Sequence, residues 1–92
     1  MASTVRTLVL NKKDNVAIAL EMVHQGTATP EGVKALTSIA RGHKFAIRDI
    51  AAGEPVLKFG QIIGFATADI LPGDWVHTHN VGMGELSHDY AF

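Results

Sequence analysis

Two histidines separated by one residue, His77 and His79, follow a tight Pro72-Gly73 turn near the end of the chain. Successive side chains of a strand point to opposite faces, so on a strand both imidazoles would share one face and could converge on a single ion or anionic ligand. Neutral imidazole nitrogens suit iron, zinc, manganese or nickel. We therefore take the pair as the candidate catalytic and metal-ligating residues. The alternative is an edge-strand pair that is merely solvated or hydrogen-bonded.

Two histidines supply only half of a tetrahedral metal shell. The remaining ligands would have to come from His43, Glu54, Asp74 or a partner chain, and the sequence does not decide among them. Trp75 shares the odd-numbered face with the pair. This tryptophan is either an apolar wall beside the site or a core residue, and periodicity does not separate the two.

A second group of candidates is cationic: His43, Lys44 and Arg48. Together they could bind the carboxylate of a substrate, with the planar guanidinium giving bidentate contact. The alternative is a solvated face with an Arg48–Asp49 surface pair, which would contribute little energy. Lys58 is expected to be an ordinary outward-facing strand residue.

The elements that must position these side chains are strands and turns, because Gly recurs at 42, 53, 60, 64 and 73 with too few residues between for helices. The pattern Ile-x-x-Gly-polar-x-apolar occurs three times, starting at Ile39, Ile50 and Ile70. In each copy the glycine is third in a four-residue unit, where a type II turn requires a positive φ. The sequence predicts a small all-β domain with short strands and tight glycine turns. A hairpin is expected near the N-terminus, with strands at 7–10 and 16–21.

Length and composition narrow the function classes. Ninety-two residues fit one domain, 1–92, without a large enclosed active site. A net charge of −1 makes nucleic-acid binding improbable. The chain has no cysteine, no signal-peptide core and no apolar run of membrane-spanning length, so we expect a cytoplasmic protein that does not bind membranes. Residues 81–92 end in apolar groups and are expected to form a tail that docks on this domain or on a partner chain.

Longer stretches at 42–50, 53–61 with 63–64, and 73–80 resemble the amino-terminal SAF-type domain of the altronate and galactarate dehydratases. Residues 14–17 fit the first hairpin of that family, and 82–85 with 89–92 fit the segment that leads toward its large catalytic region. The resemblance covers nearly the whole chain. In two places the sequence departs from the family pattern: Ala40-Arg41 stands where an Ile-Pro pair is usual, and Ile62 replaces a frequent proline. These departures affect turn rigidity and leave residues 77–80 intact.

The resemblance implies a β-clip fold and a role in a lyase that removes water from a hexonic or hexaric acid, commonly with ferrous iron or another divalent metal such as Mn²⁺. In some members, including the similar sulfolactate sulfo-lyases, the small domain is a separate subunit. We therefore expect the small subunit of a two-chain sugar-acid dehydratase, inactive without its large catalytic subunit and acting on altronate, galactarate or a related hydroxy acid. A non-catalytic binding or lid module, a free-standing metal-binding protein and a homo-oligomer are the open alternatives.

Overall fold

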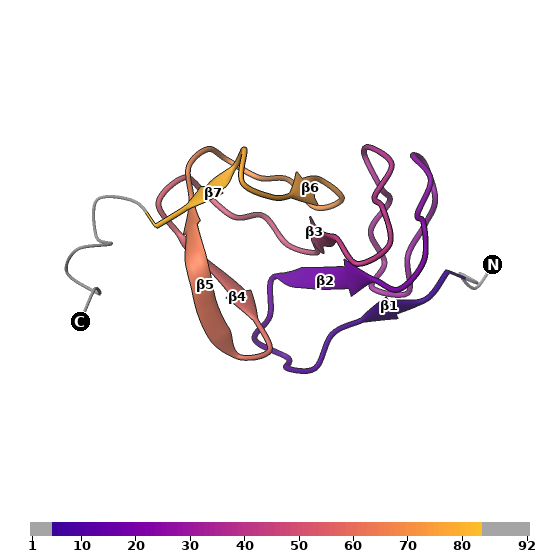
Figure 1. Ribbon diagram of the computed structural model, residues 1–92, viewed down its shortest axis with the longest axis horizontal. Coiled ribbons are helices and arrows are strands. Elements are labelled where there is room, and N and C mark those ends of the chain that lie inside the picture. The colour runs from indigo at the N-terminus through magenta and orange to yellow at the C-terminus, as the bar shows by residue number, and fades with distance from the viewer. Residues whose placement is uncertain (1–4, 84–92) are drawn as a thin grey trace.

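The computed structural model describes residues 5–83, which form two antiparallel β-sheets (Figure 1). The first sheet has the order β1 (Thr7–Leu8), β2 (Val16–Ala19), β3 (Lys44–Ala46) and β6 (Trp75–Val76). The second has the order β4 (Pro55–Lys58), β5 (Gln61–Ala66) and β7 (Val81–Gly82). No helix occurs among the described residues, and so none that could cross a membrane. The prediction of an all-β domain is confirmed.

The expected N-terminal hairpin is the pairing of β1 with β2, in which Thr7 lies opposite Ala19. Residues 20–43 then leave the sheet as two long loops, which Figure 1 shows rising side by side. Bridges between Val23 and Ile39 and between Ala28 and Lys34 hold these loops to each other. The chain returns to the first sheet as β3, which pairs with β2 on one side and β6 on the other.

The three related turns have the predicted geometry. Gly42, Gly53 and Gly73 have φ angles of 84°, 87° and 95°, and in each turn the N–H of the fourth residue donates to the carbonyl of the first at 2.9–3.0 Å. In the second and third copies the fourth residue is acidic, and the Glu54 and Asp74 carboxylates accept the N–H of the first residue. In the first copy this position is His43, whose ring remains available for other contacts.

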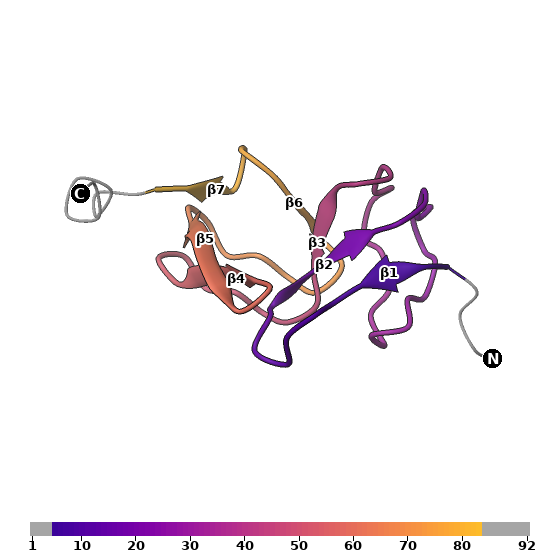
Figure 2. The ribbon, with the colours of Figure 1, turned by 60° about the horizontal axis from the view of Figure 1, so that its bottom comes forward.

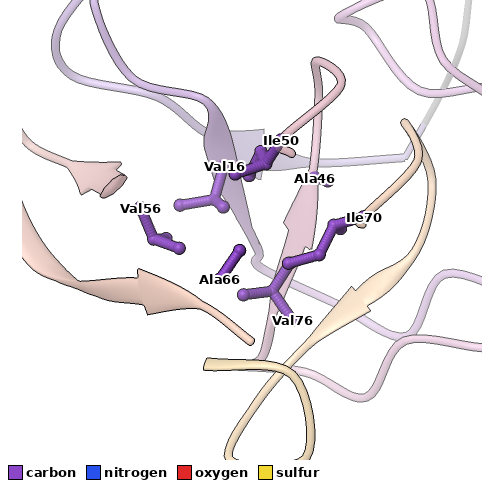
Figure 3. Close-up of a cluster of buried hydrophobic side chains, with 7 residues drawn as sticks. All are labelled: Val16, Ala46, Ile50, Val56, Ala66, Ile70 and Val76. Carbon is purple, nitrogen blue, oxygen red and sulfur yellow. The ribbon is translucent and has the colours of Figure 1, made fainter. Parts of the chain in front are cut away.

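The first sheet has a hydrophobic cluster on each face, as strand alternation requires. One cluster contains Val16, Ala46 and Val76 and fills the space toward the second sheet (Figure 3). The other is centred on Phe45 and is covered by the two long loops, with Trp75 packed against it. Figure 2 shows the second sheet at the opposite end of the molecule from these loops. Residues of both sheets therefore line the space between the two sheets.

A two-residue loop connects β4 to β5. Phe59 and Gly60 both have positive φ, 55° and 77°, as a type I′ hairpin turn requires. The carboxylate of Asp14, only 1% exposed, accepts the N–H of Phe59 and that of Gly60, each at 2.8 Å. A buried side chain from the N-terminal hairpin thus fixes the end of β4, where Lys58 is the last residue.

Candidate functional site

His77 and His79 lie in a turn, and the prediction of a strand at this point is wrong. The strand β6 ends at Val76. The buried side chain of Asn80 then closes the chain on itself: its Oδ1 accepts the N–H of His77 and its Nδ2 donates to the carbonyl of Trp75, both at 2.9 Å. A short polar side chain that bonds the local backbone competes in this way with the ladder of a strand. The turn is the segment 77–80.

Both histidines nevertheless contact the same side chain, Trp75. The His77 ring stacks on the indole with centroids 5.1 Å apart and planes 10° from parallel. The His79 ring lies 4.9 Å from the indole at 34°. His43 completes the group, with its ring centroid 5.3 Å from that of His77. We call the three histidines, together with the Trp75 indole between them, the imidazole cluster.

A hydrogen bond fixes the tautomer of His43. The indole N–H of Trp75 donates to its Nδ1 over 3.1 Å. An indole nitrogen can only donate, so Nδ1 must be the unprotonated acceptor and the proton of the neutral ring must sit on Nε2. Trp75 is therefore both a packed core residue and a wall of the site, which combines the two interpretations left open by the sequence.

The described residues do not include three or more His, Cys, Asp or Glu side chains placed to hold a metal ion together. The carboxylates of Glu54 and Asp74, the acidic candidates for further ligands, each close their own turn. A metal bound by His77 and His79 would thus need ligands from elsewhere, and it stays a prediction.

An open pocket of about 400 Å³ lies beside the imidazole cluster. Its polar lining consists of Lys44 from β3, Lys58 from β4, and His77 and Thr78 from the turn. The apolar lining is Ile63, Val81 and Met83. Lys44 shares a face of β3 with the buried Ala46, so its side chain lies on the side of the first sheet that faces the second. The pocket is therefore built by both sheets together.

The electrostatics of the pocket are dominated by its two lysines, both half-buried. Burial, and then the positive charge of Lys58, lower the pKa of Lys44 from its ordinary value. The ammonium of Lys58 lies 5.1 Å from the ring centroid of Phe59. Within residues 5–83 neither ammonium is paired with a carboxylate, since the ion pair in this part of the chain joins Arg6 to Glu21. The two lysines of the pocket, unpaired within the described residues, therefore favour the binding of a small anion.

Sequence reasoning missed Lys58. The alternation of β4 predicts only that this residue faces away from Leu57, and it was expected to be an ordinary outward-facing residue. In the structure Lys58 lines the pocket together with Lys44 of the first sheet. The pairing of β4 with β5 shifts register between Val56 and Leu57, so simple alternation along β4 does not give the direction of Lys58.

Arg48 does not join the other predicted substrate-binding residues. Its guanidinium donates to the carbonyl oxygens of Asp14 and Lys12, at 3.2 and 3.0 Å. It lines a different hollow of about 280 Å³. The structure thus places His43 and Lys44 near His77. Arg48 instead binds the backbone of the N-terminal hairpin.

Comparison with known proteins identifies the class. Residues 5–84 match the family described as the altronate/galactarate dehydratase SAF domain. The chain belongs to this family, and the sequence-based recognition is confirmed.

Individual proteins that are similar to this chain fit the family match. The chain is 49% identical over 70 residues to altronate dehydratase of Escherichia coli K12, which covers 73% of the chain and 14% of the enzyme. It is 35% identical over 74 residues to the galactarate dehydratase (L-threo-forming) of the same organism, covering 78% of the chain and 14% of that enzyme. It is also 48% identical over 44 residues to the (2R)-sulfolactate sulfo-lyase subunit alpha of Chromohalobacter salexigens, covering 48% of the chain and 47% of that subunit. The chain spans about a seventh of the dehydratases it matches.

Proposed function

We propose that this chain is the small subunit of a two-chain hydro-lyase acting on altronate, galactarate or a related hydroxy acid. The family match over residues 5–84 supports the reaction class. The similarity to a protein named as a subunit supports the division into two chains. The observation that carries the proposal is the open pocket, because two lysines and a histidine from three different parts of the fold line one hollow.

Dehydration next to a carboxylate needs a base for the carbon-bound proton, stabilisation of the negative charge that develops, and an acid for the departing hydroxyl. The two lysines of the pocket stabilise the negative charge that develops. His77, at the edge of the same pocket, protonates the hydroxyl as it leaves. The base comes from the large subunit, which closes the open side of the pocket.

His43 and His79 have supporting roles in this proposal. The indole of Trp75 donates to His43 and stacks on His77, so His43 and Trp75 together position the His77 ring. His79 is exposed at the turn and faces the large subunit. The alternative role of His77 is that of a metal ligand: with His79 it would supply two ligands of a divalent metal, Fe²⁺ or Mn²⁺, the large subunit would supply the others, and the metal would assist the departing hydroxyl in place of a proton from His77.

The test is reconstitution. The chain is mixed with its candidate large subunit, and dehydration of a panel of sugar acids is followed with and without ferrous iron, with each chain alone as a control. We expect activity only from the mixture. We also expect His77→Ala to lower kcat by about a hundredfold or more, the usual contribution of a general acid. His24→Ala is the matched control, because His24 is exposed on a long loop. Equal turnover of the two variants would contradict the catalytic role.

A non-catalytic lid or binding module is the second candidate, and one observation favours it. The ring of His77 is stacked almost parallel to the indole of Trp75, as a purely packing residue would be. His77→Phe keeps an aromatic ring for this stack but cannot transfer a proton. Full activity of the His77→Phe complex would remove the general-acid role and favour the lid function, whereas loss of activity with unchanged subunit association would favour the catalytic role.

A further inference from the structure

The pocket carries positive charge that nothing in the described part of the chain neutralises. Lys44 and Lys58 line it from two different sheets, and no Asp or Glu is among its lining residues. Half-burying two ammonium groups close together without a counter-charge costs free energy, because each loses water and repels the other. The lowered pKa of Lys44 has these two causes, burial first and the charge of Lys58 second.

Several acidic residues of the described chain accept backbone N–H groups within the fold, away from the pocket. Asp14 accepts the two N–H groups of the β4–β5 turn. Glu54 and Asp74 each close a glycine turn, and Asp69 accepts the N–H of Ala52. Within residues 5–83 no carboxylate lines the pocket, so a bound anion would be a favourable counter-charge for its two lysines.

We propose that Lys44 and Lys58 together bind one carboxylate group of a polyhydroxy acid, and that this contact spans the two sheets. This inference deepens the proposed function, since it names the end of the substrate that the small subunit recognises. The carbon chain of the acid would lie along the apolar wall of Ile63, Val81 and Met83. The hydroxyl of Thr78 and the imidazole of His77 face the same space and pair with the substrate hydroxyls.

The surroundings of the lysines favour a carboxylate over a phosphate. Phosphate sites commonly use backbone N–H groups at a helix N-terminus. The described part of the fold contains no helix. A volume of about 400 Å³ with one apolar wall suits a small organic acid. The open side leaves room for the remainder of the substrate.

The experiment uses the isolated chain, so it does not depend on the activity of any complex. Gluconate is titrated while the fluorescence of Trp75 and the NMR signals of the lysine side chains are followed, with sorbitol as the uncharged control and inorganic phosphate as a second anion. Trp75 is the single tryptophan of the sequence, and it stacks on a pocket residue, so its emission reports on occupancy. We expect saturable gluconate binding in the millimolar range and no response to sorbitol.

Lys44→Met and Lys58→Met are each expected to weaken gluconate binding by about tenfold, the scale of one charge-assisted hydrogen bond in a partly wet site. Lys12→Met is the matched control, because Lys12 is exposed and lines neither hollow described above. Absence of saturable binding, or equal affinity of all three variants, would overturn the inference. Tighter, lysine-dependent binding of phosphate would overturn the choice of carboxylate. Gluconate binding without dehydration in the reconstituted complex would leave this inference standing and reject the proposed function.

Discussion

Replacing Asp14 by alanine is expected to destabilise the protein strongly and to loosen the pocket at the same time. The carboxylate is 1% exposed and accepts two N–H groups of the hairpin turn at 2.8 Å each. That turn includes Phe59, whose φ of 55° lies in the left-handed region that side chains other than glycine rarely adopt. Without the carboxylate, little holds this residue in that conformation.

The magnitude follows from the two hydrogen bonds. A bond to a charged group contributes about 1.5–3 kcal/mol, so losing both would cost about 3–6 kcal/mol. Gly60 is exposed, and water can solvate its released N–H, which reduces the expected cost to about 2–4 kcal/mol. Chains of this length are stable by about 5–14 kcal/mol, so the loss is a substantial part of the whole. Asp14→Asn retains one acceptor and should cost about half as much.

Urea denaturation followed by Trp75 fluorescence gives the free energy of unfolding. Asp69→Ala is the control, because its exposed carboxylate accepts only the N–H of Ala52 among the hydrogen bonds of the described residues, so its removal should cost about 1 kcal/mol or less. Asp14→Asn should also bind gluconate more weakly while still folded, since Lys58 precedes the released turn. A loss below about 1 kcal/mol for Asp14→Ala would refute the role assigned to this carboxylate.

Two further predictions concern the pocket and the second sheet. Burial and the charge of Lys58 lower the pKa of Lys44 from its ordinary 10.5. Just below pH 10.5 the unfolded chain therefore binds more protons at this group than the folded chain does. As a result, Lys44 makes the free energy of unfolding rise with pH in that range. Lys58→Met should raise the pKa of Lys44 measured by NMR and reduce that rise; an unchanged pKa would contradict their interaction. Gly64→Ala would place a methyl group 2.7 Å from Val81 Cγ1, displacing β7 at a cost of about 1–3 kcal/mol. Unaltered hydrogen exchange in β7 would contradict that packing.

The fold was largely predictable because local sequence signals mark its turns. Gly42, Gly53 and Gly73 each mark a turn through a backbone requirement that the sequence displays directly. The N-terminal hairpin and the absence of helices from residues 5–83 follow from equally short-range patterns. The order of the strands did not follow, since β6 joins β3 across 28 intervening residues. No periodic pattern in the sequence predicts that two segments so far apart pair with each other.

The site was only partly predictable for the same reason. Alternation placed His77 and His79 beside Trp75, but it carried the strand too far, because the contacts of Asn80 that end β6 are not a repeating signal. The meeting of Lys44 with Lys58 depends on how two sheets pack, which no local pattern gives. Of the expected docking tail at 81–92, residues 81 and 82 form β7, while 84–92 lie outside the described residues.

The central claim is that the lysine pocket of this chain binds the acid that the complex dehydrates. The most direct measurement is kcat/KM of the reconstituted two-chain enzyme carrying Lys58→Met, compared with the same complex carrying Lys12→Met. A decrease of about tenfold or more for Lys58→Met alone, through both KM and kcat because this lysine binds the acid and stabilises the charge that develops on it, is the predicted result. Equal kcat/KM values for the two complexes would contradict the account.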